Sequence, residues 1–467
     1  MPSAEDSEIR RVEAVILFAD IIGSVSTATE YSAEEYDHFM QQFHECALHA
    51  RAAVEFWKTS GEFKYLLEAR GDEVVLVIEA DEATTVNAVK AALAYAVALK
   101  LNWIGSPYNL ARLEQGELPT DLSVGLHKGL VTVRKRYLPE REAPEGFAIS
   151  FCKRIQTAAH DGEATRILAS SEFERVCREA LTSARFGKRV LVGLKGISGP
   201  VEASEVESIL YGNLLSGAGA TKSLIGCTDD GTLSLLAKRA SEHPAETWVV
   251  RVAAVAHLLR ASVEYERGNL KGTADFLKRA ASVWPAFAEA HNNLGVVLRN
   301  LGRFDEAADE YRAAMVISPE SFVAHSNLGN LYLQLERFEE AIAEYNEAIR
   351  LGPDDPLPHT NLGVAYGNLG RFDDAVRECQ EAIRLKPDDA LSHSNLADAY
   401  LRLDRFDDAL TESVRAVELA PDMVEAHFNL GEAYLRLGDR EAALAEHEII
   451  KRLDAGEGGL FQEMMEG

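Results

Sequence analysis

The sequence contains few cysteines, and their spacing matches no metal-binding or redox motif. Five cysteines are scattered through 467 residues, and no two of them form a Cys-x-x-Cys pair. Isolated thiols of this kind are typical of reduced, mostly buried side chains, whereas a disulfide framework shows a regular set of closely spaced cysteines. We therefore expect a cytoplasmic protein.

The chain also lacks an apolar run long enough to cross a membrane, which takes roughly 18 to 20 residues. Residues 1–11 are polar and acidic, unlike a secretory signal peptide, and we expect them to be disordered. The sequence therefore predicts no membrane segment, and any membrane event would reach this protein through a partner.

Basic residues are in short supply. The chain has 48 Lys and Arg against 75 Asp and Glu, a net charge of −27, so nonspecific binding to nucleic acid or to anionic membranes is disfavoured. A nucleoside triphosphate is not excluded as a substrate, because a local site can oppose the overall charge. A chain of this length, 47% hydrophobic, has room for two or three globular domains.

The second half of the chain repeats itself every 34 residues. Histidine, asparagine and leucine recur in step at positions 291, 293 and 294 and their equivalents: His291, His325, His359, His393, His427; Asn293, Asn327, Asn361, Asn395, Asn429; Leu294, Leu328, Leu362, Leu396, Leu430. This period and pattern are identified as the tetratricopeptide repeat, a helical hairpin. Residues 257–285 fall in register one period upstream, so we expect about six repeats over 250–453, the first of them degenerate.

Each hairpin leaves an apolar face that only the next hairpin can cover, so the repeats should stack into an all-α solenoid. The histidine series fills a position usually held by a large residue, which favours helix packing. The asparagine series would form a ladder along the concave face. That ladder would either bind the backbone of an extended peptide or serve packing and solvation, and a protein or peptide partner is expected on the array.

The first half mixes strands and helices. Apolar runs predict strands over 12–22, 65–67, 74–78, 122–133, 167–169, 190–194 and 201–210, and helices over 33–58, 82–103, 146–159 and 171–182. The connection between the strands at 65–67 and 74–78 is typical of a hairpin, and strands and helices alternate irregularly along the chain. The pattern therefore favours an α+β fold with an antiparallel-rich sheet and flanking helices. We expect this domain over 12–211, a linker with a possible helix over 212–249, and a C-terminal tail over 454–467.

One strand ends in an acid. The apolar run Val15–Ala19 leads to Asp20, and the chain then turns through Gly23 and Ser24. A strand fixes the position of a carboxylate, and a tight turn presents backbone N–H groups, so such a junction suits a cation held against a phosphate. A second acid, Asp72, lies in the Gly-Asp turn of the predicted hairpin.

These residues, together with the element His127-Lys128-Gly129 and the segment from Gly146 to Arg154, resemble the class III nucleotide cyclases in identity and order. The resemblance covers about residues 12–210. It implies that Asp20, Asp72 and the carbonyl of Ile21 hold two divalent metal ions, Mn²⁺ or Mg²⁺. It also implies that turn amides at Gly23 and Ser24 face the terminal phosphates.

In that family an arginine and an asparagine reach the site from the partner chain. Arg154 matches the arginine, which stabilises the transition state, and Ser150 replaces the asparagine, with a shorter reach. Lys195, in Leu194-Lys195-Gly196, matches a phosphate-binding lysine. The resemblance therefore implies a homodimer with two shared active sites.

The residues that match the base-selecting positions are Glu68 and Ala143. Adenylate cyclases have Lys and Asp there and guanylate cyclases have Glu and Cys, so Glu68 argues against adenine. A carboxylate can accept from guanine, from uracil N3–H or from the cytosine amino group, and Arg70 could donate to a pyrimidine carbonyl.

The sequence is thus expected to encode a cyclase that forms a 3′,5′-cyclic nucleotide and pyrophosphate. A bacterial subgroup, the pyrimidine cyclases of anti-phage signalling, departs from the purine pattern in this way and uses UTP or CTP to make cyclic UMP or cyclic CMP as a second messenger. Guanylate or adenylate cyclisation in general signalling stays open. An inactive cyclase-like domain on a repeat scaffold stays open too.

Overall fold

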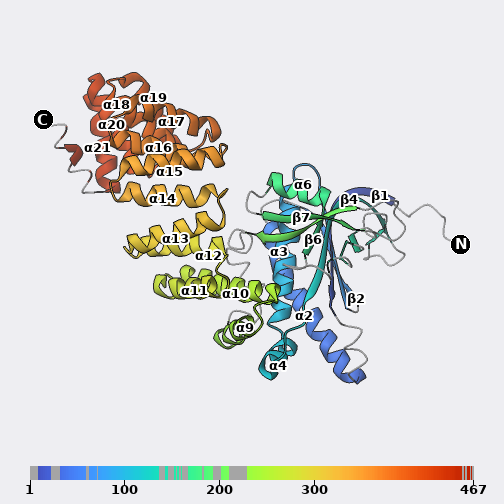
Figure 1. Cartoon of the computed structure of the whole chain (residues 1–467). Coiled ribbons are helices and arrows are strands. Elements are labelled where there is room, and N and C mark those ends of the chain that lie inside the picture. Colours follow the sequence, from blue (N-terminus) through green and yellow to red (C-terminus); the bar gives the residue numbers. More distant parts are fainter. Residues whose placement is uncertain are drawn as a thin grey trace. The chain divides into compact units, whose positions relative to one another are not determined.

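The computed structural model divides the chain into two units, residues 1–290 and 291–467, each described here by itself (Figure 1). The structure describes residues 9–22, 32–58, 63–70, 72–135, 142–145, 152–153, 155–156, 159, 167–180, 184–192, 201–209, 229–454, 457, 460–462 and 464.

The first unit is built on a mixed sheet, eight-stranded in its described part. The strand order is β2-β3-β1-β4-β6-β8-β7, with β5 paired to β4. The pairing of β4 with β6 is parallel, and the other pairs are antiparallel. The strands are β1 (Ile9–Ile21), β2 (Tyr65–Arg70), β3 (Glu73–Glu79), β4 (Leu122–Lys135), β5 (Glu142–Glu145), β6 (Ile167–Ser170), β7 (Ala184–Val192) and β8 (Val201–Ile209).

Strand β1 is the centre of the fold, with β3 on one side and β4 on the other. Its residues 14–19 are buried, because an apolar side chain on either face of a central strand meets packed neighbours. The strand begins at Ile9, three residues before the expected start, because residues 9–11 continue the ladder with β4. Residues 9–11 are therefore ordered in β1, contrary to the expected disorder.

Helices pack beside this sheet. They are α2 (Ala33–Lys58), α3 (Thr85–Ile104), α4 (Pro107–Gln115) and α6 (Ser171–Ala180). Helix α2 begins at a capping box, in which Glu35 N–H donates to Ser32 Oγ while Ser32 N–H donates to Glu35. Helix α3 lies against both α2 and strands β1, β3 and β4, which buries the aromatic core of the unit.

The segment expected as a linker contains a packed helix. Helix α9 (Asp230–Glu242) and the hairpin of α10 (Thr247–Glu266) and α11 (Leu270–Val283) belong to the first unit. Leu233 and Leu236 of α9 pack with Ile104 and Leu113 from the end of α3 and from α4. The buried guanidinium of Arg239 donates to the carbonyl of Leu113 at 3.1 and 3.3 Å. The first, degenerate repeat is thus continuous with the core of the sheet unit.

The second unit is a stack of helical hairpins. Its helices are α12 (Ala288–Asn300), α13 (Phe304–Ile317), α14 (Phe322–Gln334), α15 (Phe338–Leu351), α16 (Pro356–Asn368), α17 (Phe372–Leu385), α18 (Ala390–Arg402), α19 (Phe406–Leu419), α20 (Val424–Leu437) and α21 (Arg440–Leu453). Their period matches the one in the sequence. Gly295 allows close packing, because a Cβ there would lie 2.6 Å from the ring of Tyr311 on the next helix.

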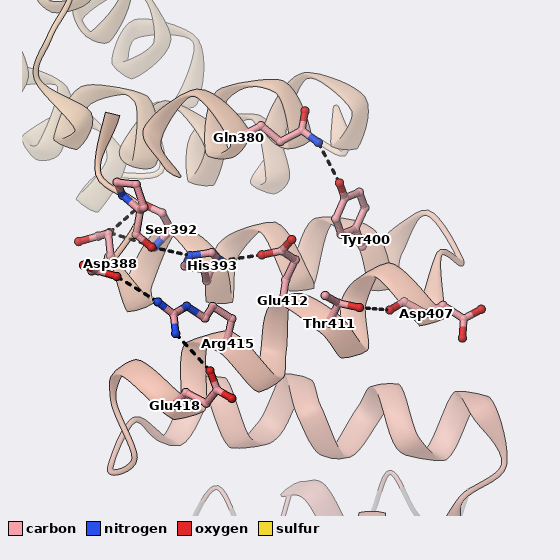
Figure 2. A network of polar contacts seen from close by, with 12 residues as sticks. Gln380, Asp388, Ser392, His393, Tyr400, Asp407, Thr411, Glu412, Arg415 and Glu418 are labelled. Carbon is pink, nitrogen blue, oxygen red and sulfur yellow. Dashed lines mark hydrogen bonds and ion pairs between the residues drawn. The ribbon is translucent and has the colours of Figure 1, made fainter. Parts of the chain in front are cut away.

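The histidine series joins the two helices of each hairpin. Nδ1 of His291, and of its four equivalents, lies 2.6–2.8 Å from the glutamate 19 residues later. Figure 2 shows the pair His393–Glu412, with the exposed ion pairs of Arg415 nearby. The histidines therefore serve helix packing, as the sequence indicated, through a polar contact rather than an apolar one.

The C-terminal tail is not only a polar end. Phe461 is fully buried against the last hairpin, edge-on to Phe428 at 5.2 Å and stacked on His447 at 6.0 Å between ring centroids. A Cβ at Gly431 would lie 2.4 Å from the Phe461 ring. The tail therefore supplies an aromatic side chain to the last hairpin, where Tyr311 plays the same part within its own hairpin.

Candidate functional site

Asp20 is placed at the end of the central strand by two ladders. Its backbone pairs with Glu73 of β3 on one side and with Ser123 of β4 on the other. The N–H of Ile22 then donates to the carbonyl of Asp121 at 3.0 Å, so the chain is still held where it leaves the strand. The apolar run that precedes Asp20 is thus the reason that its carboxylate is fixed in space.

The structure brings Asp72 to Asp20. Asp72 is in the turn just before β3 and immediately precedes Glu73, the backbone partner of Asp20, so the two predicted ligands lie at the same end of the sheet. Burial, followed by the negative charges of Asp72 and Glu73, raises the pKa of the Asp20 carboxyl to about 7, against the opposing effects of the Ile21 backbone and of Lys153. The site therefore concentrates negative charge that a cation would relieve.

The donor set fits a hard divalent cation. Carboxylate and carbonyl oxygens are the ligands that Mg²⁺ and Mn²⁺ prefer, and Asp20, Asp72 and the Ile21 carbonyl would supply them. Within the described ranges, no group of three or more His, Cys, Asp or Glu side chains is arranged to hold a metal ion. The two aspartates alone do not make such a group, so a cation here would also need the carbonyl and water as ligands.

Glu68 lies on the same face of the sheet as Asp20, and Arg70 ends the same strand. Glu68 pairs with Val75, which pairs with Phe18, and Arg70 pairs with Glu73, which pairs with Asp20. Directly opposed residues of antiparallel strands share a face, and so do residues two apart on one strand. Glu68 is half-buried on this face.

Ala143 is not brought to this end of the sheet. It pairs with Arg134 of β4, and Arg134 pairs with Ile9, at the opposite end of β1 from Asp20. One chain therefore does not combine Ala143 with Glu68 in a single site. Gly23, Ser24, Ser150, Arg154 and Lys195 lie outside the described residues.

Three residues near Asp20 were missed in the sequence. Glu73 follows Asp72 directly and forms an ion pair with Lys153. Tyr36, in the first turn of α2, has its pKa raised by burial and by the charges of Asp72 and Asp20. Glu73 and Lys153 are neighbours of predicted residues along the chain, whereas the approach of Tyr36 depends on the fold and has no signal in the sequence.

On the repeat array, asparagine side chains of the series donate hydrogen bonds to side chains of the preceding hairpin. Nδ2 of Asn327 donates to Asn292, that of Asn361 to Asn330 and that of Asn429 to Ser394, at 2.9 to 3.0 Å. Nδ2 of Asn395 is buried and has no hydrogen-bond partner among the described residues. The geometry thus favours the packing interpretation of these amides over a peptide-binding one.

A separate row on the array is apolar and exposed. Leu357 and Leu391 occupy equivalent positions, 34 residues apart, in the first turns of α16 and α18, and are 56% and 45% exposed. The equivalent positions of the other repeats hold Glu289, Val323 and Glu425, so the exposed leucines are confined to two successive repeats.

Two family models match the second half of the chain. A model described as TPR repeat matches residues 297–336 and 329–370, and one described as tetratricopeptide repeat matches 360–417 and 395–457. Residues 297–457 form a tetratricopeptide repeat array. Such arrays are protein-interaction scaffolds that expose a long binding surface. No curated protein matches the chain.

Three solved structures are similar to part of the chain. They include PilF of Pseudomonas aeruginosa (22% identity, TM-score 0.41, 45% of this chain and 97% of that one) and YrrB, described as a TPR protein with an unusual peptide-binding site (21%, 0.35, 41% and 99%). A third is the thermophilic TPR protein TTC0263 of Thermus thermophilus (24% identity, TM-score 0.34, 39% of this chain and 99% of that one). No helix in the described part of the chain is both long and apolar enough to span a bilayer.

Proposed function

We propose that the first unit is a metal-dependent nucleotide cyclase, which converts a nucleoside triphosphate into a 3′,5′-cyclic nucleotide and pyrophosphate. The observation that carries the proposal is the position of Asp20. It ends the central strand beside Asp72, and its pKa is raised to about 7 by burial and then by the neighbouring acids. The order of motifs that resembles class III cyclases supports the same assignment.

In the proposed reaction the ribose 3′-hydroxyl gives its proton to water and its oxygen attacks the α-phosphorus; the bond to the β-phosphate oxygen breaks, and pyrophosphate leaves. Divalent cations supply two things when bound: they ease loss of the 3′-hydroxyl proton and neutralise the phosphates. Asp20, Asp72 and the Ile21 carbonyl hold those cations. Arg154, assisted by Ser150, meets the charge that develops on the α-phosphate, and Lys195 with the turn at Gly23 and Ser24 binds the terminal phosphates.

The proposed base is a pyrimidine, so that UTP or CTP gives cyclic UMP or cyclic CMP. Glu68 supports this choice, because its strand position on the face of Asp20 allows its carboxylate to accept from uracil N3–H or from the cytosine amino group. Glu68 serves guanine equally well, which makes GTP the competing substrate. A cyclic pyrimidine nucleotide would act as a second messenger in antiviral defence.

The proposed active form is a homodimer with shared sites. Ala143 supports this, since its pairing places it at the far end of β1 from Asp20 and Glu68. A second chain would have to bring its own Ala143 and Arg154 to the acids of the first. The site would then be incomplete in a monomer.

The repeat array is proposed to bind a protein or peptide partner that controls the cyclase. The exposed side chains of Leu357 and Leu391 support an apolar contact with the partner. The asparagine amides are already hydrogen-bonded between hairpins, so they are less available to a partner than these leucines. The array also belongs to the class of repeats that act as scaffolds.

Replacement of the acids tests the enzyme assignment. Asp20→Asn and Asp72→Asn keep the size of each side chain but remove its charge, so pyrophosphate release with Mn²⁺ should fall by at least about a hundredfold. The matched control is Asp81→Asn, an exposed acid that caps the turn before α3 and should leave activity unchanged. Activity near wild type in both site variants would refute the metal assignment.

A further inference from the structure

Two buried polar side chains lie beside residues 20–22, the acid turn, where strand β1 ends. Gln156 Nε2 donates to Ser123 Oγ at 2.7 Å, and Ser123 Oγ makes a long contact of 3.4 Å with the main-chain carbonyl of Asp20. Ser123 is fully buried and Gln156 is 2% exposed. Burying a serine and a glutamine in a sheet core costs free energy unless they are hydrogen-bonded, and an apolar pair would fill the space without that requirement.

The position of Gln156 is fixed by its backbone. Cys152 and Gln156 pack directly on β4, where a Cβ at Gly125 would lie only 2.4 Å from the Gln156 nitrogen and 2.6 Å from the Cys152 carbonyl. Cys152 Sγ also lies 3.3 Å from the carbonyls of Ile16 and Gly125. Because Ser123 and Gly125 share one face of β4, the Gln156 amide reaches Ser123 along the strand toward Asp20.

A second buried contact holds the next residues. Lys100 Nζ lies 2.7 Å from Asp121 Oδ1 and donates to the Leu122 carbonyl, and the Asp121 carbonyl accepts from Ile22 N–H at 3.0 Å. Lys100 and Asp121 are 6% and 2% exposed, so removal of either would leave a buried charge and would threaten the fold. The residues on both sides of the Ile21 carbonyl are thus tied to buried polar groups.

We propose that Ser123 and Gln156 are positioning residues for the acid turn. They hold the Asp20 peptide against β4, so that the Asp20 carboxylate and the Ile21 carbonyl keep the spacing that a divalent cation needs. The inference rests on the proposed function, since the cation is the one that the cyclase would use. Residues that orient metal ligands in this way change metal affinity or activity by about 10- to 100-fold when they are lost.

The test compares two site variants with one remote control. Ser123→Ala removes the hydroxyl, and Gln156→Met keeps the length of the side chain without its amide. The control is Gln42→Met, which removes another buried amide, one that accepts from Tyr108 N–H at 2.8 Å on the helical side of the unit. The measurements on the full chain are the Mn²⁺ dissociation constant, from the electron paramagnetic resonance signal of free Mn²⁺, and the thermal unfolding midpoint.

We expect Ser123→Ala and Gln156→Met each to weaken Mn²⁺ binding by about tenfold, while Gln42→Met binds Mn²⁺ as the wild type does and loses as much thermal stability. The double site variant should be no weaker than the worse single variant, because the two residues act in series. Wild-type Mn²⁺ affinity in both site variants, or an equal loss in Gln42→Met, would overturn the inference and leave the cyclase standing. A wild-type protein that neither binds Mn²⁺ nor releases pyrophosphate would overturn both.

Discussion

At the scale of single residues, burial sets the protonation of groups on the face of the sheet that carries Asp20. The ring of His127 lies on β4, with Nδ1 2.9 Å from Ser170 Oγ, and burial lowers its pKa to about 4. Such a histidine stays neutral at pH 7 and accepts a proton only at a cost to the fold. His127 is thus a structural residue whose neutral ring suits its hydrogen bond.

The histidine makes a prediction about pH. In the unfolded chain His127 has an ordinary pKa near 6.5, so between pH 6.5 and 4 the unfolded state binds a proton that the folded state does not. The free energy of unfolding should therefore fall as pH falls through this window, by about 3 kcal/mol from this group. His127→Gln removes this contribution, so its stability deficit relative to wild type should shrink between pH 7 and pH 4.5.

Urea unfolding at both pH values measures that deficit, with His38→Gln, at an exposed histidine of α2, as the control. The control should show the same small difference from wild type at each pH. A His127→Gln deficit that is equal at the two pH values would contradict the assigned pKa.

Asp20 and Asp72 show how far single residues can be predicted. Their proximity follows from a strand followed by a hairpin, which the apolar runs and the Gly-Asp turn already indicate. The approach of Tyr36 does not follow, because it depends on how α2 packs against the sheet. Contacts made through sequence-distant packing leave no local pattern to find.

At the scale of elements, capping and burial decide what the sequence reveals. Helix α2 has the limits expected, Ala33 to Lys58, because its capping box is a local signal. Helix α4 was not predicted, although Ser106 caps it and Pro107 opens it, because its nine residues carry only two buried side chains. Strand β5 was not among the expected strands, since its four residues include a proline and two glutamates.

The repeats allow a prediction from their own symmetry. Asn361 donates to Asn330 at 2.9 Å, whereas Asn395, its equivalent, faces a repeat in which Val364 stands at the position of Asn330. Nδ2 of Asn395 is buried without a partner among the described residues. Val364→Asn should supply the missing acceptor and raise the free energy of unfolding of the array by about 1 kcal/mol.

The control for this change is a double-mutant cycle. Valine and asparagine have similar helix propensities, so the gain should vanish when Val364→Asn is made in an Asn395→Ala background. Urea unfolding of the full chain measures all four proteins. The same gain in both backgrounds, or a loss in the first, would show that the two positions do not bond.

At the scale of the whole molecule, charge is divided unevenly between the two units. Residues 291–467 hold 16 of the 48 Lys and Arg and 35 of the 75 Asp and Glu, which is 19 of the 27 net negative charges. The sheet unit is therefore much less acidic than the whole chain, so binding of an anionic triphosphate there meets less repulsion than the total charge implies.

The division into units also shows what the sequence could not resolve. The 34-residue period marks the array clearly, but the degenerate first repeat packs on the core of the first unit through Val249, Ala253 and Ala256 of α10. The Gly- and Ser-rich composition around residue 220 predicted a linker with a possible helix. It did not reveal that this helix, α9, packs on the end of α3 and on α4. Changes in that first repeat would therefore act directly on the core of the sheet unit.

The central claim is that this protein cyclises a nucleoside triphosphate, and mass analysis of the products tests it most directly. The full-length protein is incubated with Mn²⁺ and an equimolar mixture of ATP, GTP, CTP and UTP, with the Asp20→Asn variant as the blank. The account predicts pyrophosphate and one dominant 3′,5′-cyclic nucleotide, cyclic UMP or cyclic CMP, formed only by the wild type. No cyclic product from any of the four nucleotides, from a folded dimer that binds Mn²⁺, would contradict it.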